Sequence, residues 1–424
     1  MQVRLGELAT LRRGGTPMGV TSVCSAHPVV LRAALRYGKA TSTTVLIEAT
    51  CNQVNHLGGY TGMQPSDFAA LVYQLAEEEG CPAEQIILGG DHLGPNPWRN
   101  RPAEEAMAEA ETMVAAYVTA GFRKIHLDAS MGCLNEPAAL DDETTARRAV
   151  RLAAAAEAAA QKVGGQKPVY VIGTEVPPPG GADHMLTAIE PTASDAARKT
   201  IDIHRQVFAE ADLSDAFSRA IGLVVQPGVE FGNRNVIFYD RGKVDALTQV
   251  LRDEPQFVFE AHSTDYQGTT YLGELVKDGF PILKVGPELT FVLREALYAL
   301  DLIASDFSSD YGDRPLYRAM EALMTAHPDN WNRHYHGNDE ETRLLRHYSL
   351  SDRIRYYWAM PEAKAAVERL YEALRGQLLP LPLFWQHLPD AQHFADIPFD
   401  PEAVLIWRVE KSLAAYQRAC GPVF

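Results

Sequence analysis

The sequence predicts a (β/α)8 barrel, or TIM barrel, followed by a helical C-terminal region. Eight short apolar and β-branched runs alternate with helical patterns between residues 20 and 304. Most of these runs are continuously apolar, as expected for parallel strands that are buried on both faces. Eight strand–helix units in about 285 residues agree in number and length with such a barrel. A doubly wound sheet is the alternative, but it usually has fewer strands and a glycine fingerprint after the first strand, and this sequence has none there.

The elements follow from hydrophobic periodicity and from proline, glycine and capping signals. The barrel is expected over residues 1–305 and a helical subdomain over residues 306–424. Expected strands lie at residues 20–24, 45–48, 86–88, 124–128, 169–173, 222–226, 257–262 and 281–286. A short amphipathic helix is expected at residues 2–13, and barrel helices near 28–37, 67–79, 102–119, 141–162, 193–209, 242–252, 269–278 and 288–304. Helices of the appendage are expected near 315–325, 339–347, 351–375 and 401–419.

Composition and net charge argue against some classes of binding partner. The chain has 424 residues and a formal charge of −16, so it repels phosphate backbones and anionic lipids, and neither nucleic acid nor membrane is an expected partner. Its five cysteines are scattered and form no Cys-x-x-Cys motif, which favours a reducing compartment. The N-terminal residues lack the long apolar core of a signal peptide, so a cytoplasmic location is expected.

Polar residues follow nearly every predicted strand. Asp91 and His92 come after an apolar run and two glycines, which places them at the end of the third strand on the loop to the next helix. An Asp-His pair at such a place is often only a hydrogen-bonded loop or a helix cap. Barrel enzymes, however, place their sites at this end of the strands, so polar groups after most strands favour an active site. The others are Ser25, His27, Glu48, Asn52, Asp128, Glu175, Gln226, His262, Asp265 and Lys284.

A metal site can be built from three of these residues. His92, Glu175 and His262 end the third, fifth and seventh strands, and alternate strands contribute to one layer of a barrel. Two imidazoles and a carboxylate are a recurring set of ligands for catalytic zinc, so we expect a divalent metal, with Zn²⁺ as the first choice. Asp91 or Asp128 would move the proton in metal-assisted aldol chemistry on a keto sugar. The alternative is that Glu175 and His262 hydrogen-bond each other and no metal is bound.

Groups for a phosphate are expected after the seventh and eighth strands, where barrels commonly bind one. Ser263 and Asp265 follow one strand, and Lys284 and Gly286 end the next. Lys284 could equally pair with Glu260 at the strand end. In the appendage, Arg353 and Arg355 lie two residues apart on the expected helix, which favours packing and surface pairing over a phosphate clamp.

Several long motifs resemble one family. They are Glu48-Ala49-Thr50 with Asn52-Gln53-Val54-Asn55, Leu88-Gly89-Gly90-Asp91-His92-Leu93-Gly94-Pro95-Asn96, Ile125-His126-Leu127-Asp128, Ile172-Gly173-Thr174-Glu175-Val176-Pro177, Val224-Val225-Gln226-Pro227-Gly228-Val229-Glu230-Phe231, Glu260-Ala261-His262-Ser263-Thr264-Asp265-Tyr266 and Tyr348-Ser349-Leu350-Ser351-Asp352-Arg353. Over nearly its whole length the chain resembles the Z subunits of D-tagatose-1,6-bisphosphate aldolase, the GatZ/KbaZ family.

The resemblance implies a barrel related to the zinc-dependent class II ketose-bisphosphate aldolases. It assigns acid–base chemistry to Asp91, a metal ligand to His92 and a second one to His262. Glu48, at the end of the second strand, is a further catalytic candidate beside Asp91 and Asp128. A further histidine ligand expected near the sixth strand has no match, because Gln226 stands there, and Gln226 or Glu230 is left to complete the site. Candidate groups for substrate binding are Asn52, Gln226, Ser263, Asp265, Lys284 and Gly286.

Three functions follow from these expectations. The first is a component of a tagatose-bisphosphate aldolase that works with a class II catalytic subunit. The second is a metal-dependent 4-epimerase that interconverts tagatose 6-phosphate and fructose 6-phosphate by retro-aldol chemistry. The third is a scaffold that binds a sugar phosphate without chemistry. The expected ligand is thus tagatose 6-phosphate or the 1,6-bisphosphate, and an oligomer is expected. Members of the family are also labelled tagatose-6-phosphate kinases, but the chain has neither a Gly-x-x-x-x-Gly-Lys-Ser/Thr loop nor a protein-kinase signature set.

Overall fold

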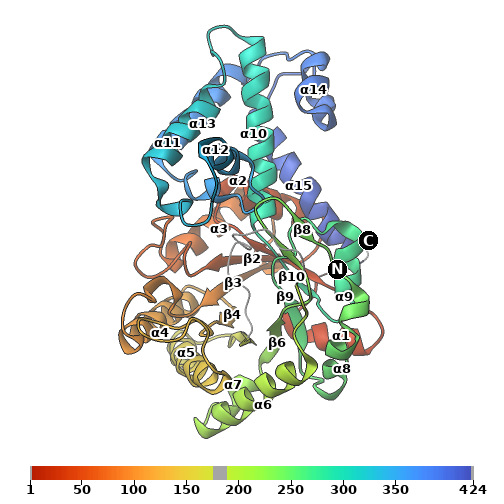
Figure 1. Cartoon of the computed structure of the whole chain (residues 1–424). Coiled ribbons are helices and arrows are strands. Elements are labelled where there is room, and N and C mark those ends of the chain that lie inside the picture. Colours follow the sequence, from red (N-terminus) through yellow and green to blue (C-terminus); the bar gives the residue numbers. More distant parts are fainter. Residues whose placement is uncertain (1, 175–188, 422–424) are drawn as a thin grey trace.

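A computed structural model describes residues 2–174 and 189–421 and confirms the barrel. Eight parallel strands close into one barrel in the order β1-β2-β3-β4-β5-β6-β9-β10 (Figure 1). A two-stranded antiparallel hairpin, which sequence reasoning missed, lies in the connection after β6. The barrel strands are β1 Val20–Cys24, β2 Val45–Thr50, β3 Ile86–Leu93, β4 Lys124–Leu127, β5 Val169–Ile172, β6 Ala220–Val225, β9 Val258–Ala261 and β10 Ile282–Val285, and the hairpin is β7 Glu230–Phe231 with β8 Val236–Ile237.

Helices surround the barrel and extend beyond one side of it (Figure 1). Those of the barrel region are α1 Leu8–Arg13, α2 Pro28–Thr41, α3 Pro65–Glu79, α4 Ala103–Thr119, α5 Asp142–Val163, α6 Ser194–Glu210, α7 Ser214–Phe217, α8 Asp245–Asp253, α9 Gly268–Lys277 and α10 Pro287–Phe307. Those of the C-terminal region are α11 Pro315–Ala326, α12 Asp339–Tyr348, α13 Pro361–Leu374, α14 Leu381–His387 and α15 Pro401–Ala419. Short 3₁₀ segments are η1 Leu5–Glu7, η2 Ala83–Gln85, η3 Asn96–Trp98, η4 Arg241–Lys243, η5 Pro328–Asn330, η6 Arg353–Tyr356 and η7 Pro389–Phe394.

The third strand is longer than predicted and contains the Asp-His pair. Asp91 still pairs with Thr50 of β2, and its carbonyl accepts a hydrogen bond from the amide of Cys51, so the strand continues through residue 93. The pairing with β4 shifts register between Gly90 and Leu93. Within this irregularity His92 has φ 48°, a left-handed conformation that is uncommon for histidine. The bulge therefore re-aims the side chain of His92, as bulges beside functional sites often do.

The amino end of the barrel is closed by the N-terminal segment. Val3, Leu5 and Leu8 are buried and pack with apolar residues from the beginnings of the strands, among them Val20 and Ile282. The predicted helix over residues 2–13 is thus a 3₁₀ turn followed by α1. Because these apolar residues close the amino end of the barrel, a polar active site is expected at the carboxyl ends of the strands.

The last helix, α15, completes the ring of helices around the barrel. It packs against α2, α9 and α10, while α10 extends away from the barrel into the C-terminal region (Figure 1). The amide of Gly19, just before β1, donates a 2.7 Å hydrogen bond to the carbonyl of Cys420. The predicted division at residue 305 falls inside α10, so the C-terminal region is joined to the barrel by packing as well as by sequence.

The helix predicted over residues 351–375 is broken. The segment forms the 3₁₀ turn η6 and then α13, which begins at Pro361. Proline suits the first turn of a helix and disfavours helix in the residue before it, which explains the break.

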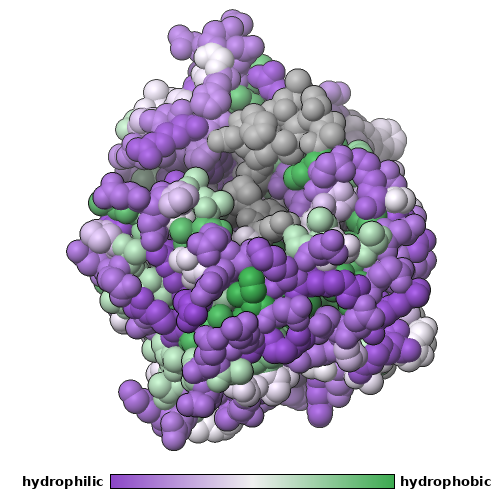
Figure 2. All heavy atoms as spheres, turned by 60° about the horizontal axis from the view of Figure 1, so that its bottom comes forward, coloured by the Kyte–Doolittle hydropathy of each residue, from purple (hydrophilic) through white to green (hydrophobic). Residues whose placement is uncertain are grey.

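The face of the molecule in Figure 2 is mostly hydrophilic, with only small separate hydrophobic areas. Within residues 2–174 and 189–421, no helix combines the length and the apolar character needed to cross a bilayer.

Candidate active site

A network of buried ion pairs fills the barrel beneath its carboxyl end. Nζ of Lys124 lies 2.8 Å from carboxylate oxygens of both Glu48 and Glu260. Nζ of Lys284 lies 2.7 Å from Glu48, 2.7 Å from Asp91 and 3.5 Å from Glu260. All five side chains are buried. A buried charge without a partner would destabilise the fold. The ion pairs of this network therefore hold the carboxylate of Asp91 in place.

Three histidines gather around Asp91. His92 and His126 come from β3 and β4, and His262 follows β9; their ring centroids lie 4.8 to 5.2 Å apart. Nδ1 of His92 is 2.7 Å from Oδ2 of Asp128, and Nδ1 of His126 is 3.1 Å from Oδ1 of Asp91. One ligand atom from each of Asp91, His92, His126 and His262 lies within 4.8 Å of the others.

The cluster fits a divalent metal ion. Nε2 of His126 is buried and, within the described part of the chain, has no hydrogen-bond partner. Such an orphaned nitrogen is costly unless a ligand satisfies it. Imidazole nitrogens with a carboxylate oxygen are the donors that zinc and similar divalent ions take, and Asp128 behind His92 gives the usual carboxylate support for a histidine ligand.

The electrostatics keep the carboxylates charged and one histidine neutral. Burial by itself would raise the pKa of Asp91, but His92 and Lys284 lower it well below its ordinary value. Burial opposes the charged form of His92, yet Asp91 and Asp128 raise its pKa. For His262, burial dominates and lowers the pKa to about 3, so this imidazole is neutral near pH 7 and free to act as a ligand.

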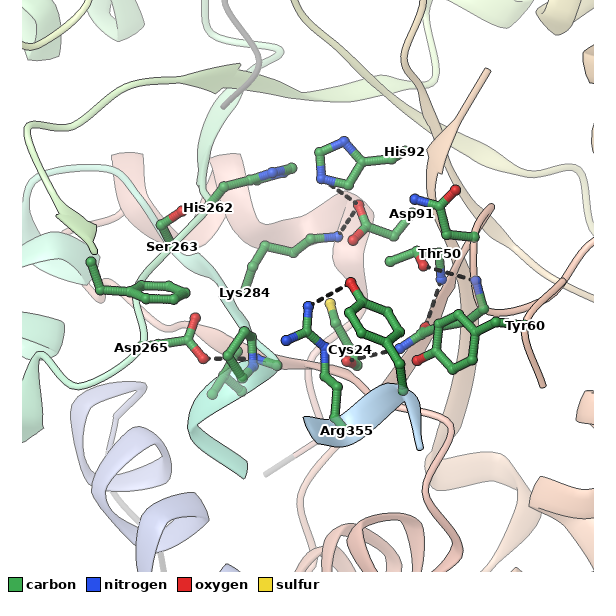
Figure 3. A pocket seen from close by; sticks show the side chains of 17 residues that line it. Cys24, Thr50, Tyr60, Asp91, His92, His262, Ser263, Asp265, Lys284 and Arg355 are labelled. Atoms are coloured by element: carbon green, nitrogen blue, oxygen red, sulfur yellow. Dashed lines mark hydrogen bonds and ion pairs between the residues drawn. The ribbon is translucent and has the colours of Figure 1, made fainter. Parts of the chain in front are cut away.

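Several of the predicted residues line a cavity at this end of the barrel (Figure 3). In Figure 3 the side chains of His92, Asp91, Lys284 and His262 lie close together on one side of it. The predicted residues on its wall are Asn52, Asp91, His92, His262, Ser263, Asp265, Lys284 and Gly286.

Three predicted residues lie behind the wall. Glu48 holds Lys124 and Lys284, and Asp128 hydrogen-bonds His92. The side-chain oxygen of Gln226 accepts hydrogen bonds from the amides of Gly228 and Val229, so it is taken up by its own loop. The predicted ligand Glu175 lies outside the described residues.

The side chains predicted to bind a phosphate are largely engaged by other groups of the protein. Oδ1 of Asp265 accepts hydrogen bonds from the amides of Gly286 and Glu288, at 3.0 and 2.8 Å, where α10 begins. The ammonium of Lys284 is held by carboxylates, as in the alternative considered from sequence, although Glu48 and Asp91 lie closer to it than Glu260 does.

Sequence reasoning missed His126 as a member of the cluster, although its signal is present. Lys124 and His126 alternate along β4 and Asp128 follows its last residue, and alternate residues of a strand face the same side. It also assigned Arg355 to packing, whereas Arg355 and Tyr356 of η6 lie on the cavity wall. No local pattern shows that this distant turn folds over the barrel.

Together, the fold and the site define a (β/α)8-barrel protein with acid–base and metal-ligating side chains at the carboxyl ends of its strands. Residues 5–421 match the D-tagatose-1,6-bisphosphate aldolase subunit GatZ/KbaZ-like family, and the chain belongs to this family.

Relatives support this membership. The chain is 61% identical over 421 residues, or 99% of each chain, to a D-tagatose 6-phosphate 4-epimerase of Agrobacterium fabrum (strain C58). A crystal structure of a probable tagatose 6 phosphate kinase from Sinorhizobium meliloti 1021 is 51% identical with a TM-score of 0.87, covering 95% of this chain and 100% of that one. The fructuronate-tagaturonate epimerase of Cohnella laeviribosi shares only the fold, at 13% identity and a TM-score of 0.51, covering 94% of this chain and 81% of that one.

Proposed function

We propose that this protein is a metal-dependent D-tagatose 6-phosphate 4-epimerase, which forms D-fructose 6-phosphate. The observation that carries the proposal is the meeting of Asp91 with three histidines, two of which, His92 and His262, lie with it on the wall of one cavity. The 61% identity to a protein with this activity supports the choice of substrate. Zn²⁺ is the first choice of metal, since imidazole ligands suit it.

The reaction needs one proton acceptor beside O4 of the sugar. The carboxylate of Asp91 takes the proton of the 4-hydroxyl, the C3–C4 bond breaks, and its electron pair moves toward the C2 carbonyl. The aldehyde fragment turns, C3 attacks its other face, and Asp91 returns the proton to O4, so C4 is inverted with no net change in atoms or electrons. When bound, a divalent metal would polarise the C2 oxygen and stabilise the negative charge that develops there.

The chain holds these groups in place. Lys284 keeps Asp91 ionised and oriented, Asp128 orients His92, and Glu260 hydrogen-bonds Nε2 of His262 at 3.0 Å. Walls from barrel loops and from η6 enclose the cavity, which retains the aldehyde fragment while it turns.

The charge balance also supports a divalent cation. Four carboxylates surround the histidines, and two ammonium groups, those of Lys124 and Lys284, oppose them. Within the described part of the chain, and with the three histidines neutral as metal ligands must be, these four negative and two positive charges leave a formal charge of −2, which a divalent ion would balance. The carboxylates are Glu48, Asp91, Asp128 and Glu260.

The test incubates the pure protein and Zn²⁺ or Mn²⁺ with D-tagatose 6-phosphate and follows the products by carbon-13 NMR. We expect D-fructose 6-phosphate to form without ATP, and we expect Asp91→Asn, His262→Ala and chelation each to abolish its formation. Asp240→Asn, on an exposed turn, is the matched control that should retain turnover. Turnover that survives all three treatments, or no turnover by the wild type, would reject the proposal.

The family description favours a second candidate, a subunit that assists a class II tagatose-bisphosphate aldolase. In this case the pure chain would give little cleavage of the bisphosphate, and adding a class II catalytic subunit would raise it. A catalytic partner, an oligomer and a cytoplasmic location stay predictions.

A further inference from the structure

Among the residues that the structure describes, one cation on the cavity wall has no carboxylate partner. The wall includes two basic residues besides the histidines, Lys284 and Arg355. Lys284 is surrounded by carboxylates. None of the ion pairs found within residues 2–174 and 189–421 includes Arg355.

The contacts of Arg355 hold its guanidinium in place without removing its charge. Nη1 donates to the carbonyls of Ser351 and Asp352, the latter at 3.2 Å, and Nη2 donates at 2.8 Å to the hydroxyl of Tyr356. In Figure 3 Arg355 rises from η6 and points into the cavity. Neutral acceptors thus orient the guanidinium of Arg355, and its positive charge is left for a ligand.

The local field is positive at this wall. Burial by itself would raise the pKa of Tyr356, but Arg355 and Arg353 lower it below its ordinary value. The opposite wall carries Asp91 and the negative network, which would repel a phosphate. An anionic substrate group is therefore favoured on the Arg355 side.

There is room for such a group. A second cavity adjoins the first, and Cys24, Gln53, Tyr60, Gly286 and Arg355 line both of them. A phosphate at Arg355 lies where the two cavities meet, while the sugar carbons extend toward the histidines.

The turn that presents Arg355 is tied to the barrel loops. The side-chain oxygen of Asn233, in the loop after β7, accepts hydrogen bonds of 2.9 Å from the hydroxyls of Ser349 and Ser351. The hydroxyl of Tyr266, after β9, donates a 2.6 Å hydrogen bond to the carbonyl of Leu350. These contacts give the C-terminal region a fixed position at the mouth of the barrel.

We infer that Arg355 binds the phosphate of the ketose phosphate, so that the C-terminal region selects phosphorylated substrates while the barrel performs the chemistry. This inference rests on the proposed function for the identity of the ketose. A guanidinium suits the task because it can donate two parallel hydrogen bonds to a phosphate.

The experiment compares wild type with Arg355→Gln and Arg355→Lys, all loaded with Zn²⁺. Loss of a charge-assisted contact should raise KM for D-tagatose 6-phosphate about 10-fold to 100-fold in Arg355→Gln, with a smaller rise in Arg355→Lys. Activity with unphosphorylated D-tagatose should change little. Arg343→Gln, an exposed arginine of α12 bonded to the hydroxyl of Tyr317, is the control that should match wild type.

Calorimetric titration with D-fructose 6-phosphate, inorganic phosphate and D-fructose separates this inference from the proposed function. Binding of both phosphates that weakens in Arg355→Gln, with D-fructose unaffected, supports the inference even if the wild type epimerises nothing. Equal affinity of wild type and Arg355→Gln for D-fructose 6-phosphate overturns it, even if the epimerase activity is real. Arg355→Lys keeps a cation on the turn and supplies the comparison if Arg355→Gln does not fold.

Discussion

Arg294 of α10 and Asp352, the residue before η6, form a buried ion pair, with Nε of Arg294 2.9 Å from Oδ1 of Asp352. Both side chains are almost fully buried, and Asp352 has φ 46°. The pair fixes a left-handed turn immediately before the residues that cover the cavity.

Asp352→Asn should therefore destabilise the protein. Removing one charge of a buried pair leaves the other uncompensated, at a cost of about 3–5 kcal/mol. Urea unfolding measures the loss, and Arg294→Met combined with Asp352→Asn should recover part of it, because asparagine tolerates the left-handed conformation at this position. Unchanged unfolding midpoints in the single variant would show that the pair does not hold the turn.

His126→Gln should lower the metal content of the purified protein. His126 offers the cluster a buried nitrogen without a hydrogen-bond partner among residues 2–174 and 189–421, and the glutamine side chain lacks an imidazole donor. Elemental analysis after dialysis measures the bound zinc. His56→Gln, a half-buried histidine paired with Glu109, is the control and should keep the wild-type content. Equal metal content in both variants would contradict a role for His126 as a ligand.

Lys284→Met should cost stability in a way that depends on pH. Without the ammonium, Asp91 and Glu260 lose a shared positive partner that lowers their pKa values, so both pKa values in the folded state rise. A carboxyl group whose pKa is higher in the folded than in the unfolded state destabilises the fold as pH increases. The difference in free energy of unfolding between Lys284→Met and wild type should therefore widen between pH 5 and pH 8. Denaturant unfolding at both pH values measures this difference. Lys411 is exposed, so Lys411→Met should differ from wild type by less than about 1 kcal/mol in free energy of unfolding at either pH. A difference independent of pH would count against this account.

Asp265→Asn should stabilise the protein above neutral pH. Burial and the nearby Glu288 raise the pKa of Asp265 to about 7, well above the unfolded value. Wild type therefore loses stability as pH rises from about 4 to about 7, and the loss is complete above pH 7. Asparagine keeps an oxygen for the amides of Gly286 and Glu288 and carries no charge. Unfolding at pH 5 and pH 8.5 tests this, and a variant that gains nothing at pH 8.5 would contradict the raised pKa.

The barrel could be predicted because each strand carries its own signal. Apolar runs such as Leu223-Val224-Val225 read as buried strands wherever they occur, and their number gives the fold. Asp91, His92 and His262 could be predicted to meet because the ends of parallel strands share one rim. The place of Arg355 could not, because it depends on tertiary contacts of Asn233 and Tyr266 with a turn far along the chain. Nor could the engagement of Gln226 by its own loop be predicted from its position after a strand.

The position of α15 between α2 and α9 bears on how the protein is made. During synthesis the eighth strand emerges long before α15, since residues 286–400 must be translated in between. Until α15 has been made, the side of the barrel that it covers in the finished fold stays without its helix. Covering this side is therefore a late step of folding that joins distant parts of the chain.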